Sequence, residues 1–278
     1  MTERPSAEGV PIPPRDAVLI RPSKAADAAA EVLAFLGPLS TSKRWVLGAV
    51  AAGVLPILVC WLAEWPGQRF ATGLFLFPFY LPLVLTDRQR AGFASVLIAF
   101  SCHSLLAIAL AALDPAGAST VMPGGEAYWN KNIYWIRTGF DPEYEVLNWL
   151  PAHLQHLASM SFFSVTSFGL IPLFQGLYEI DVMNFYVGRL IPLSVNPLVA
   201  LLVGWHTWAV LRGVAYTRIV FEVSSYSLEK LTGVVLSTPR RRRLRWTTGL
   251  VLLSLDGLLK FLFLGAVREV LQSNLIPS

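Results

Sequence analysis

The chain has 278 residues, of which 54% are hydrophobic and 14% are charged, whereas about a quarter of the residues are charged in ordinary soluble domains. Its net charge of +4 arises from basic residues beside apolar segments, without a nucleic-acid-binding motif, so no nucleic-acid partner is expected. The two cysteines, Cys60 and Cys102, lie in apolar segments, which excludes a disulfide framework and a cysteine-based zinc site.

Residues 1–43 are rich in proline, alanine and charge, which predicts a mobile polar tail with one short amphipathic helix. No secretory signal peptide is expected, because its apolar stretch would fall within about the first 15–30 residues. Residues 44–278 form the predicted membrane domain. Its apolar runs cover about residues 45–63, 70–86, 92–113, 157–178, 187–211 and 247–266.

Several of these runs approach the ~20 residues that a helix needs to cross the hydrocarbon core of a bilayer. The alternation typical of a membrane β-barrel is missing. We therefore expect an all-α polytopic membrane protein with about five to six transmembrane helices, one of them re-entrant or broken. The second run contains Pro78 and Pro82 and is an alternative to the fifth run as the re-entrant one.

The connection 114–156 is rich in Trp, Tyr and carboxylates and predicts a loop that lies on the membrane surface. At its end, His153 and His156 are three residues apart and share a helical face. No third ligand of fixed spacing follows, so we expect no metal site. The histidines inside apolar runs, His103 and His206, are expected to be neutral, hydrogen-bonded core residues.

The fifth run is interrupted by Arg189, Pro192, Asn196 and Pro197, and a basic segment follows at 212–246. If this run dips into the membrane and returns to the same face, most Lys and Arg residues fall on the cytoplasmic side, as the positive-inside rule requires. We therefore expect a cytoplasmic N-terminus and a cytoplasmic segment 212–246, in which residues 216–236 form a helix along the membrane surface.

The last run contains two charged residues, Asp256 and Lys260. Because they are four residues apart, they share one face of a helix and can form a pair. Charged groups are costly at this depth. Two interpretations remain: a proton- or ion-coupled site with Asp256 as the carrier, and a structural ion pair that faces the bundle.

A second group of polar residues lies between or within the fourth and fifth runs. Its carboxylates, amides and arginine predict either a site for a cationic solute or a turn at the water boundary. The intramembrane candidates in this group are Gln175, Glu179, Asp181, Asn184, Arg189 and Asn196.

The stretch 237–246 is strongly basic, which is typical of a segment that is kept on the cytoplasmic side and that attracts anionic lipid headgroups. The candidate headgroup contacts are Arg240, Arg241, Arg242, Arg243 and Arg245.

No nucleotide-binding, haem-attachment or nucleophile-elbow motif is present, so no cofactor is expected. We expect a bacterial inner-membrane protein that acts as a non-enzymatic subunit in transport or membrane-complex assembly, with lipid and other membrane or cytoplasmic subunits as its partners. The alternative is a membrane-embedded enzyme acting on lipid, with His153, His156 and loop carboxylates as acid and base groups. In the assembly version, the small residues around Ala49 and Gly53 contact a partner.

Overall fold

The computed structural model describes residues 44–86, 88–140 and 146–277, and the polar tail predicted for residues 1–43 lies outside them. These residues form helices, with one isolated β-bridge between Ser194 and Leu275. The helices are α2 (Arg44–Leu62), α3 (Gln68–Leu85), α4 (Gln89–Leu113), α5 (Pro115–Val121), α6 (Gly125–Thr138), α7 (Val146–Ser167), α8 (Leu170–Leu190), the 3-10 turn η1 (Ile191–Leu193), α9 (Pro197–Gly204), α10 (Thr207–Thr232) and α11 (Pro239–Ser273).

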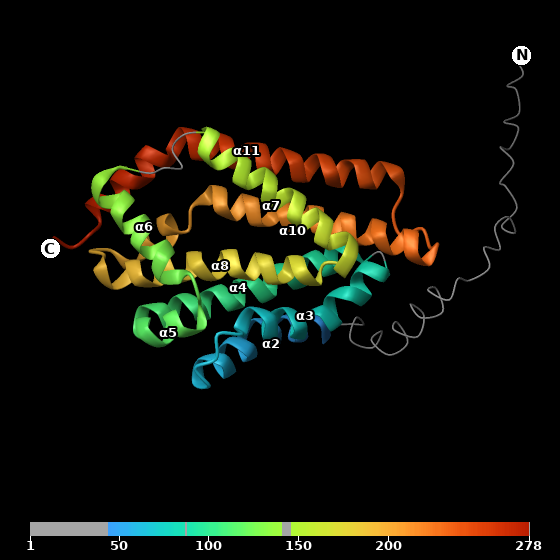
Figure 1. Ribbon diagram of the computed structural model, residues 1–278, viewed down its shortest axis with the longest axis horizontal. Coiled ribbons are helices and arrows are strands. Elements are labelled where there is room, and N and C mark those ends of the chain that lie inside the picture. The colour runs from blue at the N-terminus through green and yellow to red at the C-terminus, as the bar shows by residue number, and fades with distance from the viewer. Residues whose placement is uncertain (1–43, 87, 141–145, 278) are drawn as a thin grey trace, which may run out of the picture.

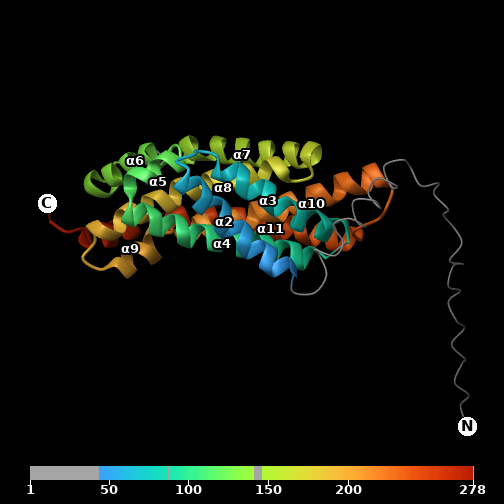
Figure 2. The ribbon, with the colours of Figure 1, turned by 90° about the horizontal axis from the view of Figure 1, so that it is seen from below.

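The long helices run along the long axis of the molecule and pack side by side (Figures 1 and 2). In the centre, α8 packs against α4, and α10 packs against α11 and α7. The short helices α5, α6 and α9 and the C-terminus gather at one end, which we call the α6 end (left in Figure 1). The connections α3–α4 and α10–α11 lie at the opposite end, which we call the arginine end because α11 begins there with its run of arginines.

Four helices are long and apolar enough to cross a membrane: α2, α3, most of α4, and α11. A fifth span arises if α9 and α10, which are bent by 42° at the break between them, count as one. The outward face of α11 carries large apolar side chains such as Leu258, Phe261 and Phe263, which suits contact with lipid. The chain is thus an all-α polytopic membrane protein with one broken helix pair, as its sequence predicts.

Two details of the first three helices differ from the expectations. Helix α3 continues through Pro78 and Pro82, so the second run is not re-entrant. The small residues of α2 pack inside the molecule, because a Cβ atom on Gly53 would lie 2.3 Å from the carbonyl oxygen of Ala99 on α4. Ala49 is fully buried as well. The small-residue face therefore joins α2 to α4 and does not offer a surface to a partner.

The fourth and fifth apolar runs, expected at 157–178 and 187–211, do not form one helix each. A turn at Phe168 and Gly169, both with positive φ (52° and 95°), divides the fourth run into α7 and α8. The fifth run is divided among the end of α8, η1, α9 and the start of α10. The chain therefore reaches the α6 end by α8 and leaves it by α10.

The segment 216–236 also differs from the expectation of a helix on the membrane surface. Most of it belongs to α10, which runs lengthwise beside α11 and buries Tyr216, Phe221 and Glu222. The charged residues of this segment suggested a water-exposed face, but Glu222 and Glu229 form ion pairs with Arg242 of α11 inside the bundle. The start of α2 and the α10–α11 connection nevertheless lie toward the same end (Figure 2).

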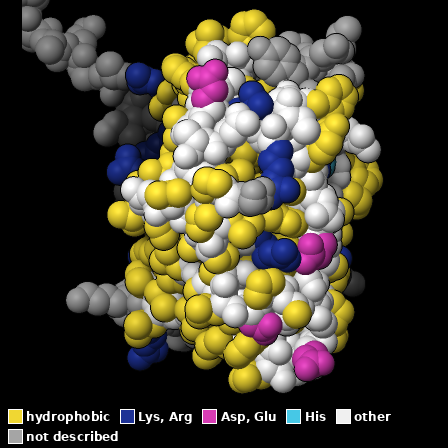
Figure 3. Space-filling view, turned by 90° about the vertical axis from the view of Figure 1, so that its left-hand side faces the viewer, with side chains coloured by type: hydrophobic (Ala, Val, Ile, Leu, Met, Phe, Trp, Pro, Cys, Tyr) yellow, Lys and Arg dark blue, Asp and Glu magenta, His cyan; other side chains and the backbone are white. Residues whose placement is uncertain are grey.

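At the α6 end, charged side chains of both signs are interspersed among apolar ones (Figure 3).

The C-terminal residues hold the turn before α9: Asn274 Oδ1 accepts from the backbone N–H of Asn196 at 2.9 Å, and Asn274 Nδ2 donates to the Asn196 carbonyl at 3.0 Å. The Asn196 side chain accepts from the N–H of Leu198 and so caps α9. Asn196, a candidate site residue, therefore has a structural role.

Candidate functional site

An ion pair between α10 and α11 forms the first part of the site. Asp256 accepts two hydrogen bonds of 3.0 Å, from Nε and Nη2 of Arg212. The Asp256 side chain is 2% exposed and that of Arg212 is 25% exposed. Asp256 and Lys260 both lie on the buried face of α11, as their spacing predicts. Arg212 supplies the counter-charge for Asp256.

Helix α7 covers this pair with an aromatic and a histidine side chain. His153 Nε2 lies 3.7 Å from Asp256 Oδ2, and its Nδ1 is 2.7 Å from the carbonyl oxygen of Trp149. The Lys260 ammonium lies 5.8 Å from the centre of the Trp149 ring, within the range of a cation–π contact. Basic groups therefore outnumber carboxylates among these side chains of α7, α10 and α11.

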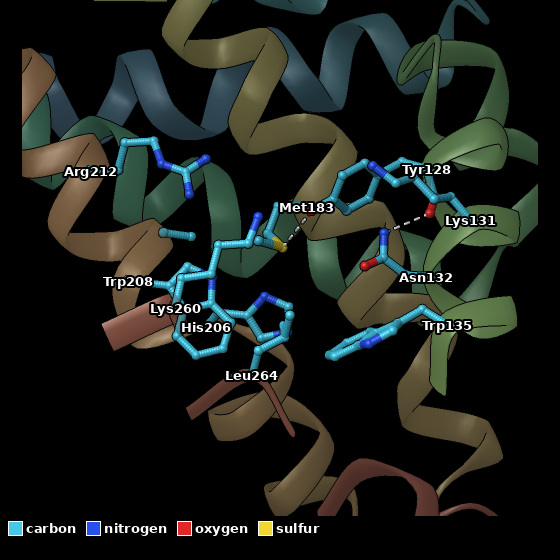
Figure 4. Close-up of a pocket in the computed structure, with 11 residues that line it drawn as sticks. Tyr128, Lys131, Asn132, Trp135, Met183, His206, Trp208, Arg212, Lys260 and Leu264 are labelled. Carbon is cyan, nitrogen blue, oxygen red and sulfur yellow. Dashed lines mark hydrogen bonds between the residues drawn. The ribbon is translucent and has the colours of Figure 1, made fainter. Parts of the chain in front are cut away.

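A pocket of about 50 Å³ opens beside the ion pair. Figure 4 shows its polar and aromatic side chains converging from several helices. The lining comprises Tyr128, Lys131, Asn132 and Trp135 of α6, Met183 of α8, His206, Trp208, Ala209 and Arg212 at the start of α10, and Lys260 and Leu264 of α11. Among these lining residues three are Lys or Arg, and none is Asp or Glu.

The pocket lies at the break between α9 and α10. His206 precedes the first residue of α10, and Trp208 and Ala209 belong to its first turn. The His206 side chain makes no capping hydrogen bond to this turn. The first N–H groups of a helix carry a partial positive charge. The broken helix thus directs the electropositive end of α10 toward a pocket that already has basic walls.

A second polar cluster is buried among α3, α4 and α8. Asp181 Oδ1 lies 2.6 Å from His103 Nε2, and Asp181 Oδ2 accepts from Gln68 Nε2 at 2.8 Å. The side chains of His103 and Asp181 are 0% and 2% exposed. His103 is thus hydrogen-bonded and buried, as expected, but its partner is a carboxylate, which links two residues that the sequence analysis treated separately.

The other candidates of the fourth and fifth runs are dispersed. Gln175 Nε2 donates to Ser159 Oγ at 2.8 Å, and Asn184 Oδ1 accepts from Trp205 Nε1 at 3.2 Å. Glu179 lies 3.7 Å from His156, with both side chains nearly half exposed. Arg189 pairs with Glu126 at 2.7 Å and lies against the Trp129 ring. These residues therefore do not assemble into one site for a cationic solute.

Two residues of the arginine run are held by carboxylates of α10. Arg242 donates to Glu222 and Glu229, and Arg245 donates to Glu222, whose side chain is fully buried. Arg240, Arg241 and Arg243 are exposed. Of the five arginines expected to contact lipid headgroups, Arg242 and Arg245 instead join the start of α11 to α10. The exposed three remain candidates for that contact.

The acid and base groups proposed for an enzyme do not converge either. His153 faces Asp256, whereas His156 faces Glu179. The loop carboxylate Asp114 caps α5 and accepts from Trp61 Nε1 at 3.0 Å. The other loop carboxylates of that hypothesis, residues 141, 143 and 145, lie outside the described residues. Within the described ranges, no three His, Cys, Asp or Glu side chains are grouped to hold a metal ion.

Lys131, Asn132 and Arg212 line the pocket but were not foreseen as site residues. Lys131 was assigned to a surface loop, and Arg212 to a cytoplasmic segment. One signal was available: Arg212 follows an apolar run directly and precedes another helical stretch, so its charge needed a partner if that stretch crossed the membrane.

Comparisons of the chain with protein-family models, with curated proteins and with solved structures gave no match.

Proposed function

We propose that this membrane protein is a non-enzymatic transport subunit and that the pocket at the start of α10 binds a small anionic solute. The observation that carries the proposal is the lining of the pocket, in which Lys131, Arg212 and Lys260 approach from three helices. Such groups can form charge-assisted hydrogen bonds with an anion.

The break before α10 supports the same ligand class. Discontinuous helices in transporters direct the N-terminus of a half-helix at an anionic group of the substrate. Here Trp208 and Ala209, in the first turn of α10, line the pocket together with the basic residues. The partial positive charge at the start of α10 therefore adds to that of the basic side chains around the pocket.

The size of the pocket limits the anion. A cavity needs about 10–15 Å³ to hold one water molecule, so about 50 Å³ suits several waters or an anion of roughly three to five non-hydrogen atoms. Trp135 and Trp208 form part of the wall, and their indole fluorescence offers a direct report of binding.

The transport role is favoured over assembly because the small-residue face of α2 is used within the molecule, against α4. We place the arginine end in the cytoplasm of a bacterial cell, at the inner membrane, because α11 begins there with its arginines and basic segments stay on that side. The exposed residues Arg240, Arg241 and Arg243 would contact anionic headgroups there.

Binding is tested with the full chain in phosphatidylcholine nanodiscs, by titrating nitrate, acetate, sulfate and phosphate against tryptophan fluorescence. We expect saturable binding of at least one of these anions and about tenfold weaker binding after Lys131→Gln or Lys260→Met. The matched control is Lys230→Gln, because this lysine lies near the end of α10, against Tyr226, away from the pocket.

Transport is tested in proteoliposomes by uptake of the anion that binds. No saturable binding of any of the four anions, or equal affinities in all variants, would contradict the proposal. If phosphatidylglycerol in the nanodisc competes with the anion, the pocket holds a lipid headgroup and the transport role fails.

The orientation has its own test, with single cysteines in a Cys60→Ala/Cys102→Ala background and an impermeant maleimide. Val235 is 80% exposed at the arginine end, and Phe140 is 64% exposed beyond α6. We expect Phe140→Cys to react on intact cells and Val235→Cys to react only after permeabilisation. The reverse pattern would reject the proposed orientation.

A further inference from the structure

We infer that His103 and Asp181 form a proton-binding site that takes up a proton when an anion occupies the pocket. The linkage to the anion rests on the proposed function, whereas the proton site rests on the buried cluster among α3, α4 and α8. Three observations support the inference: the arrangement of the pair, its connection to the pocket, and the engagement of the neighbouring charges elsewhere.

The pair has room for one more proton. A single proton on His103 Nε2 accounts for the 2.6 Å contact with Asp181 Oδ1, and Gln68 Nε2 donates to the other carboxylate oxygen. His103 Nδ1 is buried and has no hydrogen-bond partner among the described residues. In this form the pair has a charge of −1. A proton that binds to Nδ1 makes the imidazole an imidazolium and the pair neutral, with no other bond changed.

Burial gives this step a driving force. Both side chains are at most 2% exposed, and an uncompensated negative charge is unfavourable in such surroundings. Gln68 Oε1 and Thr72 Oγ1 on the same side of α3 are buried without hydrogen-bond partners in the described structure. Gln68 begins α3 after the buried Gly67, two positions beyond the exposed Pro66, so the cluster lies near the end of α3 that adjoins an exposed turn.

One turn of α8 brings this pair near the pocket. Asn184 follows Asp181 by one turn of α8, and its Oδ1 accepts from Trp205 Nε1 at 3.2 Å. The next residue, His206, lines the pocket, and so does Met183 on α8. The pair and the pocket therefore adjoin the same turn of α8, which is the basis for a charge interaction between them.

Several charged side chains on the helices around the cluster are engaged elsewhere. On α3, Arg69 lies over the rings of Phe70 and Tyr178. The remaining carboxylates also have partners: Asp114 accepts from Trp61, Glu126 pairs with Arg189, and Glu179 lies beside His156. Asp181 is the charged residue in direct contact with His103.

An anion brings negative charge to the shared turn and so favours the protonated pair. By linkage, a proton on His103 must raise the affinity for the anion by the same factor. We expect affinity to increase as the pH falls, by roughly tenfold, within the 5–150-fold range of typical couplings. The transported anion is then accompanied by about one proton.

The test uses nitrate as the probe, because nitrate does not titrate near neutral pH. Proton uptake on nitrate binding is measured with a pH indicator in weakly buffered nanodiscs, and the protonation of His103 is followed by 15N NMR between pH 5 and 8. We expect about one proton per nitrate, and an His103 resonance whose titration midpoint rises with nitrate. Asp181→Asn and His103→Gln should bind nitrate without proton uptake, whereas His156→Gln should behave like the wild type.

The outcomes separate the two proposals. Nitrate binding without proton uptake, or uptake that persists in both His103→Gln and Asp181→Asn, overturns this inference and leaves the anion site intact. If no anion binds, the proposed function and the linkage fail together, and the NMR titration still decides the proton site. If the His103 ring keeps one protonation state between pH 5 and 8, the proton site itself is overturned. Thermal unfolding of both variants shows which of them retain the fold.

Discussion

Arg212 and Asp256 form a two-bond ion pair that joins α10 to α11 beside the pocket. Removing one partner of a buried pair leaves an uncompensated charge, which costs about 3–5 kcal/mol in well-buried cases. Because the Arg212 side chain is 25% exposed, we expect Asp256→Asn to lower the free energy of unfolding by roughly 3 kcal/mol. Denaturant unfolding in detergent, followed by tryptophan fluorescence, measures the change.

The double variant Arg212→Leu/Asp256→Leu should regain most of this loss, since it leaves no unmatched charge. The control is Arg189→Gln, which breaks a pair with the 48% exposed Glu126 and should cost less than about 1 kcal/mol. If the losses of stability in Arg212→Leu and Asp256→Leu simply add in the double variant, Arg212 and Asp256 do not stabilise each other.

Asp256→Asn should raise the affinity of the pocket for nitrate, although it lowers the stability of the fold. Asp256→Asn removes a negative charge that partly neutralises Arg212, a residue of the pocket wall. In folded Asp256→Asn protein we therefore expect nitrate to bind several-fold more tightly than in the wild type, by fluorescence titration. Weaker binding in that variant would place the anion away from Arg212.

Glu222 should be more important for stability than any exposed arginine near it. Its two carboxylate oxygens accept from Arg242 Nε at 2.9 Å and Arg245 Nη1 at 3.0 Å, and its side chain is fully buried. Glu222→Gln leaves these guanidinium groups with less compensation, so we expect a loss of about 2–3 kcal/mol. Arg243→Gln, at an exposed position, should change stability by less than about 0.5 kcal/mol. Equal losses would show that Glu222 does not hold the connection.

The contact of α2 with α4 depends on the absence of a side chain at Gly53. Gly53→Ala would place a Cβ atom 2.3 Å from the Ala99 carbonyl oxygen, and we expect it to destabilise the fold by roughly 1–3 kcal/mol. Gly265→Ala is the matched control, since a Cβ atom there meets nothing within 4 Å. Thermal unfolding of both variants in detergent decides whether the close approach matters.

The fold class was predictable because composition and run length determine whether a chain is solvated by lipid. The division of the fourth and fifth apolar runs into shorter helices was harder to predict. The turn at Phe168 and Gly169 lies within one apolar stretch, and hydropathy does not detect a reversal that occurs without polar residues. The position of α10 was missed for the converse reason. The charges of Arg218, Glu222, Glu229 and Lys230 made residues 216–236 resemble a surface helix, but Arg242 of α11 matches those of Glu222 and Glu229.

For the site, spacing within one helix was informative and contacts between helices were not. Asp256 and Lys260 share a face because a spacing of four residues is close to one helical turn. The partners of Asp256 and Asp181 come from residues 44 and 78 positions away, which no local pattern indicates. Lys131 joins the pocket because α6 lies across the end of the bundle, a placement that depends on the packing of the whole chain.

The turn at Phe168 and Gly169 has a consequence for biogenesis. Neither α7 nor α8 is among the helices apolar enough to qualify individually as a span, since each carries polar groups that are matched only inside the finished bundle. Only Phe168 and Gly169 separate the end of α7 from the start of α8. We therefore expect the insertion machinery to release them as a helical hairpin, after α4 is in place to receive α8.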